Sequence, residues 1–339
     1  MFVPEGVMEL FFRKIAQLSA SLVFVILAAT TLVLYLSAKP AIEEFGVKFL
    51  FESRWGEEEK LELSPAQLAE LESLKADKEQ PLEDDFIEDE EDFIFDDEDF
   101  ITDDDMDSED KTSREVYGAL VPIVGTVFST LIAMLFSVPI AMGIAVFLSE
   151  IAPAAVAKPV GIAIELLASI PSIIYGMWGL FYFGPFIAAL FGGNTVSLLV
   201  AGLVLGIMVI PFMAALSRDA ITTVPDMLKE SAYAMGATKL EVIKDVVFPY
   251  ARSGIIGSII LSFGRALGET MAVAFVIGGV YQFAKKVTDP TNSIPVVLAN
   301  SFAESSGLSL SVLFYLALIL FVLSFIVIAS AKFYFLRKK

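Results

Sequence analysis

The chain has 339 residues, 56% of them hydrophobic, and its 42 acidic and 23 basic side chains give a formal net charge of −19. A mean hydropathy of +0.72 excludes an ordinary soluble domain and indicates a membrane protein. Cysteine and histidine are absent, which excludes disulfides, thiol nucleophiles, Cys/His metal sites and histidine acid–base chemistry. The sequence has no G-x-x-x-x-G-K-[ST] phosphate loop, so we expect no catalytic residue, metal or cofactor on this chain.

Six apolar segments are long enough to cross a bilayer, which requires about 20 residues per helix. Backbone groups in lipid must pair internally, so the sequence predicts an all-α integral membrane protein with six transmembrane helices. The uncharged run 166–217 is too long for one helix, and Gly184-Pro185 together with Gly192-Gly193-Asn194 predicts where it divides. The predicted spans are 15–36, one within 116–149, 159–183, 195–216, 253–281 and 309–331.

The distribution of lysine and arginine indicates the orientation, because basic residues concentrate in cytoplasmic loops. With the N-terminus inside, the inner faces carry 12 basic residues and the outer loops carry 7, not counting one acidic segment. We therefore expect a multi-pass protein surrounded by lipid, with both termini in the cytoplasm; the resemblance described below implies the bacterial inner membrane. Nothing in this charge pattern points to nucleic acid as a partner.

The acidic segment 57–110 differs from the rest of the chain. It holds 26 acidic residues and 3 lysines, and the remaining residues have a net charge of +4. The predicted orientation places it outside the membrane, between the first two spans. It thus divides the chain into a first helix and the start of an outer loop (1–56), an acidic extracytoplasmic insertion (57–110) and a permeation core (111–339).

Two structures are compatible with this insertion. Its high charge and its lack of glycine favour a solvated, disordered loop, with a short helix at 64–77. Alternatively, the Asp-Phe-Ile repeats that begin at Asp85, Asp92 and Asp99 anchor the segment on a basic partner surface. A calcium loop of the EF-hand type is disfavoured, because it requires a glycine in mid-loop.

The third predicted span contains a carboxylate and a proline. Glu165 lies near its cytoplasmic end, before Pro171, and we expect it to cap a helix or to pair with a neighbouring cation. Ser169, Ser172 and Tyr175 surround the proline, where their hydroxyl groups either contact substrate or satisfy backbone groups that the proline frees. A structural role is preferred for these residues, and a place on the substrate path is the alternative.

The longest inner loop, 218–252, contains KESAYAMGATKLEVIKDVVFPYARSGI. Its composition predicts a short helix, a turn at Gly236, where glycine allows conformations that a side chain hinders, and a second helix. The loop resembles the signature loop of importer-type ABC permeases, with Ser231 and Phe248 as mild departures. The matching residues are Glu230, Ala232, Gly236, Val246 and Pro249.

That resemblance implies that the loop is a knob that docks into a groove of a separate ATPase subunit. Glu230, Ala232, Gly236 and Pro249 would then be its coupling residues. The alternative is a helix that merely lies on the membrane surface.

The fifth predicted span holds two charges four residues apart, Arg265 and Glu269, which predicts that they share one helix face. Arg265 lies 12 residues beyond Ser253, which corresponds to a depth of roughly 18 Å. A charge at such depth usually faces the bundle interior or a water-filled path. The guanidinium can bind two oxygens of a phosphate-like anion, and Glu269 can hold Arg265 when the path is empty. A static structural ion pair is the alternative.

Four stretches resemble the permeases of phosphate-specific ABC transporters, their C-type subunit more than the A-type. They are YGALVPIVGT at 117–126, GIAIELLASIPSIIYGMWGLF at 161–181, GRALGETMAV at 264–273 and LANSFAESSGL at 298–308. The resemblance covers 38–55 and 117 to the end, and leaves out only the acidic insertion. It implies the fold of the type I ABC importer permeases.

The resemblance also implies a function in inorganic phosphate import, with Arg265 and Glu269 on the path. Expected partners are an A-type permease, two ATPase subunits that bind ATP and Mg²⁺, and an extracytoplasmic phosphate-binding protein. The alternatives are a permease for another oxyanion, such as sulfate or molybdate, and a membrane scaffold or sensor in phosphate signalling.

Overall fold

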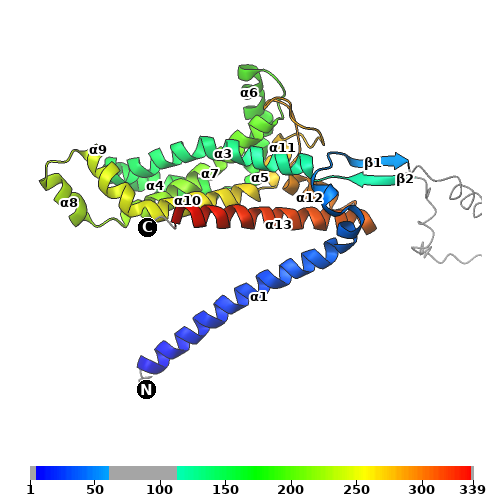
Figure 1. The fold of residues 1–339 in the computed structure, drawn as a ribbon. Coiled ribbons are helices and arrows are strands. Elements are labelled where there is room, and N and C mark those ends of the chain that lie inside the picture. The colour runs from blue at the N-terminus through cyan, green and yellow to red at the C-terminus, as the bar shows by residue number, and fades with distance from the viewer. Residues whose placement is uncertain (1–4, 61–112, 337–339) are drawn as a thin grey trace, which may run out of the picture. The chain divides into compact units, whose positions relative to one another are not determined.

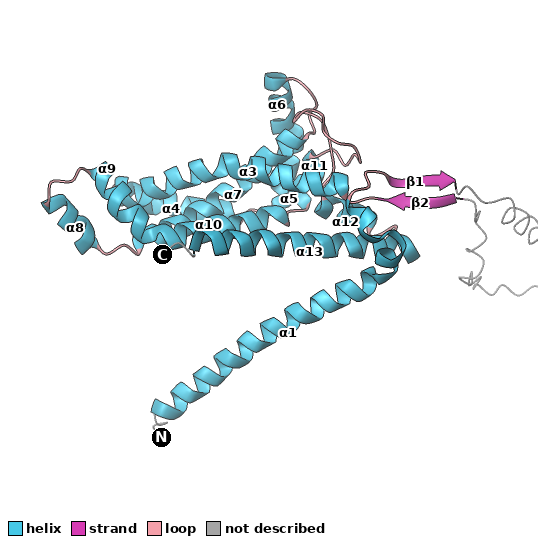
Figure 2. Cartoon of the chain, in the orientation of Figure 1, coloured by secondary structure: helices cyan, strands magenta, loops and turns pink. Residues whose placement is uncertain are grey.

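The computed structural model describes residues 5–60 and 113–336. These form two compact units, Met1–Ser53 with Gly118–Lys339, and Arg54–Tyr117. Figure 2 shows that helices dominate the described residues and that their two named strands form one small sheet.

The named elements of the first unit are all helical (Figure 1). Short 3₁₀ or π-helical turns, labelled η, extend several of its helices. Its elements in chain order are α1 (Glu5–Phe45), η1 (Gly46–Leu50), α3 (Leu120–Val146), η3 (Phe147–Ile151), α4 (Ala154–Ala168), α5 (Ser172–Trp178), η4 (Gly179–Phe183), α6 (Gly184–Phe191), α7 (Leu198–Thr222), α8 (Asp226–Ala234), α9 (Lys239–Glu241), η5 (Val242–Val247), α10 (Phe248–Leu267), α11 (Met271–Val276), α12 (Ile294–Ser301) and α13 (Gly307–Leu336).

Six helical segments of the described chain are long and apolar enough to cross a membrane, which confirms the predicted number of spans and the all-α class. They are Arg13–Leu50, Leu120–Ile151, Ser172–Phe191, Leu198–Thr222, Lys239–Leu267 and Gly307–Phe333.

The third predicted span, 159–183, is wrong in its position. The helix breaks between α4 and α5, ahead of Ser172, because a proline disfavours helical geometry in the residue before it. The expected break at Gly184-Pro185 does not form, since Pro185 falls in the first turn of α6, where its missing N–H costs nothing. The span therefore runs from Ser172 to Phe191.

The fifth predicted span, 253–281, is wrong as one continuous helix. The α10 helix ends at Leu267, with Gly268 as its C-cap, and α11 begins only at Met271. At the other end the span begins earlier than predicted, at Lys239, because α9, η5 and α10 follow one another without interruption.

The α7 helix is the most buried span, with 67% of its most apolar window inside the protein. It lies beside α3 and α10 in Figure 1, and α10 also packs against α13. Glycines permit the close approach of α7 to α3: a Cβ on Gly202 would lie 2.6 Å from Ile132, and one on Gly206 would lie 3.1 Å from the Ala133 carbonyl. This spacing of small residues is a common device of membrane helix pairs.

The second unit contains strands β1 (Trp55–Lys60) and β2 (Ser113–Tyr117), which pair antiparallel. At one end of the ladder the rings of Trp55 and Tyr117 meet edge to face at 5.2 Å, and at the other Lys60 pairs with Ser113. The residues between the strands, including the predicted helix at 64–77 and the Asp-Phe-Ile repeats, lie outside the described residues. The domain boundaries at 57 and 110 therefore stay predictions.

The helical unit holds the two chain segments that lead to these strands close together. The amide of Ala119 donates to the Phe49 carbonyl at 2.8 Å. The amide of Leu120 donates to the Glu52 carbonyl at 3.2 Å. Gly118 is required here, because a Cβ on it would lie 2.1 Å from the Glu52 carbonyl oxygen. These hydrogen bonds hold the segment after η1 against the start of α3.

Candidate functional site

The break between α10 and α11 lies within the packed bundle. Ala266 before it is 3% exposed, Ala272 after it is fully buried, and both belong to the main hydrophobic core. Gly176 on α5 allows this packing, because a Cβ there would lie 3.0 Å from the Ala272 backbone. Irregular backbone at such depth is tolerated where protein buries it or where it lines a water-filled cavity.

Arg265 is in the last turn of α10, and its side chain is exposed in the isolated chain. Its guanidinium carbon lies 5.3 Å from the ring centroid of Phe212 on α7, which is a cation–π distance. Among the described residues, no carboxylate lies within 4.0 Å of this guanidinium. Arg265 is therefore held by an aromatic face, and its N–H groups are not used by an ion pair.

Glu269 does not share a helix face with Arg265, contrary to the prediction, because Gly268 ends α10 between them. The half-buried carboxylate instead accepts the amide N–H of Ala272 through Oε1 at 3.2 Å. A free N–H at the start of a helix needs such an acceptor. Glu269 thus stabilises the first turn of α11 in this conformation.

Tyr175 lies on α5, half-buried, beyond the break at Pro171. Its hydroxyl donates to the Leu167 carbonyl at 3.1 Å, across the break at Pro171. The Ser169 hydroxyl donates to the Leu166 carbonyl at 2.7 Å, so both side chains satisfy carbonyls at the end of α4. Ser172, half-buried, begins α5.

Glu165 pairs with Arg218, which the sequence alone did not single out. Arg218 Nη2 lies 2.8 Å from Glu165 Oε1 and 3.4 Å from Asp219 Oδ1. Gly161 makes room for this arginine, since a Cβ on it would lie 2.2 Å from Arg218 Nη1. The pair joins α4 to the end of α7.

The loop 218–252 forms the predicted knob, with α8 before the turn and α9 after it. Gly236 has a φ of +89°, a conformation that side chains disfavour, so the predicted glycine turn is confirmed. The second helix begins with a capping box, in which the Thr238 amide donates to Glu241 at 2.7 Å and the Glu241 amide donates to Thr238 at 3.4 Å.

The knob packs against the bundle through an apolar cluster. Ala232 is 7% exposed and packs there with side chains of α7, η5, α10 and the C-terminal end of α3. Glu230, Gly236 and Pro249 are exposed. Of the four predicted coupling residues, Ala232 therefore faces the interior of the knob.

Exposed apolar side chains surround the knob's turn, a feature that the sequence pattern did not reveal. Met227 is 77% exposed, Met235 is 85% and Leu240 is 74%. On a polar loop such residues are typical of a protein contact surface, where methionine adapts its shape to a partner.

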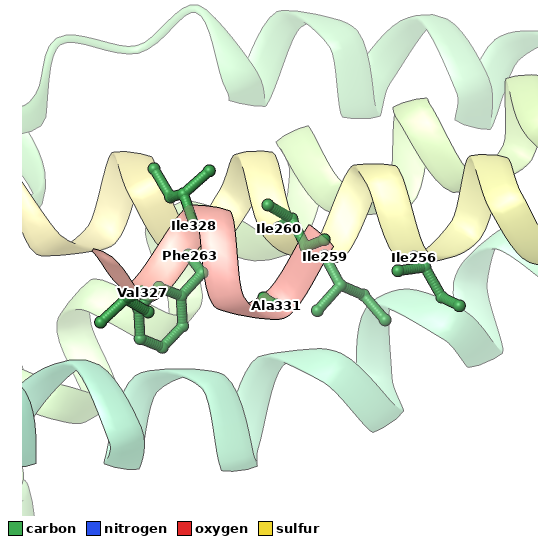
Figure 3. A pocket seen from close by; sticks show the side chains of 7 residues that line it. All are labelled: Ile256, Ile259, Ile260, Phe263, Val327, Ile328 and Ala331. Atoms are coloured by element: carbon green, nitrogen blue, oxygen red, sulfur yellow. The ribbon is translucent and has the colours of Figure 1, made fainter. Parts of the chain in front are cut away.

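A cavity of about 260 Å³ lies between α10 and α13 (Figure 3). Its seven lining residues are all apolar, and Figure 3 shows Phe263 of α10 beside Val327 and Ile328 of α13. A charged anion cannot be stabilised there, because it would lose its hydration without gaining a polar partner. The guanidinium of Arg265 is the better candidate for anion binding.

Comparison with known proteins identifies the family. A family profile described as the binding-protein-dependent transport system inner membrane component matches residues 118–339. The phosphate transport system permease protein PstC of Haemophilus influenzae is 38% identical over 344 aligned positions, covering 96% of this chain and 92% of that protein. The chain belongs to the PstC family of inner membrane permeases.

Other PstC permeases agree over the bundle. The PstC protein of Pasteurella multocida is 47% identical over 244 residues, 66% of this chain and 76% of that protein. Among solved structures, an inward-facing form of the MetNI methionine ABC transporter aligns with a TM-score of 0.52. It is 19% identical and covers 62% of this chain and 91% of that chain, which shows the shared fold of type I importer permeases. As in the PstC family, the chain is a multi-pass inner membrane protein and a translocation subunit.

Proposed function

We propose that this chain forms part of the path through which an ATP-driven importer moves inorganic phosphate. The observation that carries the proposal is the exposed Arg265 guanidinium at the break between α10 and α11, with no carboxylate beside it in the described residues. A guanidinium presents paired N–H donors that fit two phosphate oxygens, and its charge persists at every physiological pH. Relatives that cover 66% and 96% of this chain are named for phosphate transport.

The path would be completed by a second permease of the A-type, whose surface covers the exposed side of Arg265. An extracytoplasmic binding protein delivers phosphate, and two ATPase subunits carry ATP and Mg²⁺. The exposed Met227, Met235 and Leu240 support docking of an ATPase subunit on the knob. This arrangement requires the knob and both chain termini to be cytoplasmic.

In this mechanism phosphate enters between the two permeases and loses part of its hydration beside Arg265. The arginine balances the anion's charge, while the ring of Phe212 holds the guanidinium in place. Glu269 caps α11 in the present conformation, and after phosphate leaves it turns to Arg265. Movement of the knob then changes which side of the bundle is open.

The proposal is tested with the complete complex in liposomes, with ATP inside and the phosphate-binding protein outside. We expect saturable uptake of labelled phosphate that depends on ATP and is not reduced by an equal concentration of sulfate or molybdate. Competition by either oxyanion would change the substrate assignment. Absence of any phosphate movement by an assembled complex would instead favour a scaffold or sensor.

The role of the acidic insertion in transport can be tested by replacing it with a short hairpin turn. Lys60 and Ser113 lie opposite each other in the β1–β2 ladder, so Asn-Gly in place of 61–112 can close a two-residue turn. Since long surface insertions contribute little to stability, we expect uptake within about twofold of the parent chain. Uptake is measured at equal amounts of assembled complex. A large loss would show that the insertion engages a partner during transport.

A further inference from the structure

An ion pair joins the knob to the inner end of α3. Lys229 Nζ on α8 lies 2.7 Å from Glu150 Oε1 in the π-helical turn η3, and the two residues are 79 positions apart in the sequence. The side chains are only 15% and 8% exposed. By contrast Asp226, the other acid near Lys229, is 3.7 Å away and 87% exposed.

The position of Lys229 on α8 divides that helix into two faces. Lys229 and Ala232 are three residues apart and both point into the protein, whereas Met227 and Glu230 are exposed. The exposed face is available to an ATPase subunit. The inner face contacts the permease through an apolar core and through one shielded ion pair.

Burial and hydrogen bonds also hold in place the end of α3 and the η3 turn that carries Glu150. Ala145, two residues before η3, is fully buried in the same cluster as Ala232. The Ser149 hydroxyl donates to the Ala145 carbonyl at 2.8 Å, and the Ala152 amide closes the π-turn on the Phe147 carbonyl. π-Helical turns interrupt regular helices mainly at functional positions.

A shielded ion pair resists separation, because each partner would be left as an uncompensated buried charge. Displacing α8 therefore pulls the end of α3 with it. The α3 helix packs along α7, which carries Phe212 beneath Arg265. The contacts that lead from α8 to Arg265 thus pass through η3, α3, α7 and the ring of Phe212.

We propose that the Lys229–Glu150 ion pair is the positioning link through which α8 moves the inner end of α3, so that its loss uncouples ATP hydrolysis from phosphate movement. This inference rests on the proposed function. Lys229 and Glu150 touch neither phosphate nor nucleotide in this scheme.

The test measures phosphate moved per ATP hydrolysed in liposomes that contain the complete complex. Lys229→Met and Glu150→Gln are expected to keep ATP hydrolysis but to lower this ratio about tenfold. The exchanged pair Glu150→Lys with Lys229→Glu is expected to recover much of it. Lys39→Met is the matched control, because it breaks an ion pair whose side chains are 58% and 67% exposed, and it should leave the ratio unchanged.

A double-cysteine variant tests the proposal if the complexes that carry the single substitutions do not assemble. The chain has no cysteine, so Glu150→Cys with Lys229→Cys introduces its only thiols. A short bifunctional methanethiosulfonate, which joins the two thiols through disulfides, should restore the ratio, and reduction of these disulfides by dithiothreitol should abolish it again. The parent complex treated with the same reagents is the control for thiols on other subunits.

An unchanged ratio in both single variants would overturn the proposal. So would assembly-deficient single variants combined with a crosslinked pair that does not regain coupling, since the ion pair would then be structural only. If the parent complex itself moves no phosphate, the proposed function fails rather than the link.

Discussion

Replacing Arg265 with glutamine is expected to reduce phosphate uptake by about 100-fold. The substitution removes one partner of the proposed Arg265–phosphate pair, and losing one partner of a shielded charge pair costs about 3 kcal/mol. Glutamine keeps hydrogen-bonding capacity but removes the positive charge that balances phosphate. Arg265→Lys keeps the charge but loses the planar fork, so we expect an intermediate rate. Both rates are measured as ATP-dependent uptake of labelled phosphate by the reconstituted complex.

The matched control is Arg13→Gln, which makes the same change at an exposed arginine of α1, outside the knob. Its uptake should stay close to that of the parent chain. Co-purification of the ATPase subunits with the Arg265 variant establishes that assembly is intact. Undiminished uptake by an assembled Arg265→Gln complex would remove this arginine from the phosphate path.

The second large effect is expected at Gly236. A Cβ at this position would meet nothing within 4 Å, so space does not limit substitution there. The φ of +89° does limit substitution, because a side chain on a backbone with positive φ costs about 1–2 kcal/mol. A β-branched side chain is the least tolerated. Gly236→Val should therefore distort the turn and weaken binding of the ATPase subunit about tenfold.

Binding is measured by titrating the purified ATPase subunit onto the reconstituted permease pair. Gly236→Asn is the control at the same position, because asparagine tolerates positive φ far better than valine does. We expect near-parental affinity for asparagine and a clear loss for valine. Equal affinities for the two variants would mean that the turn geometry is not needed for docking.

Features that depend on neighbouring residues alone could be predicted from the sequence. Apolar runs of sufficient length identified six spans, and the single glycine of the loop marked the turn of the knob. The errors came from glycine and proline inside apolar runs. Gly268 ends a helix whereas Gly184-Pro185 does not, although both lie within long, mainly apolar segments.

The reason is that membrane helices tolerate glycine and proline when neighbouring helices satisfy the freed backbone groups. Whether they do so depends on packing partners, which are distant in sequence. Gly268 is followed by Glu269, whose carboxylate accepts the Ala272 amide and so stabilises a separate α11. The spacing of Arg265 and Glu269 suggested a pair on one face, and this local reasoning failed at that break.

The sequence by itself determined the membrane class, the number of spans, the acidic composition of 57–110 and the glycine turn of the knob, since each follows from local composition and backbone preference. Only the tertiary structure decided which charges meet. It joined Glu165 to Arg218 and Glu150 to Lys229 and placed Phe212 against Arg265, whereas Arg265 and Glu269, close in sequence, do not form a pair. Such contacts depend on how helices pack around shared small residues, and a linear pattern of hydropathy carries no record of that packing.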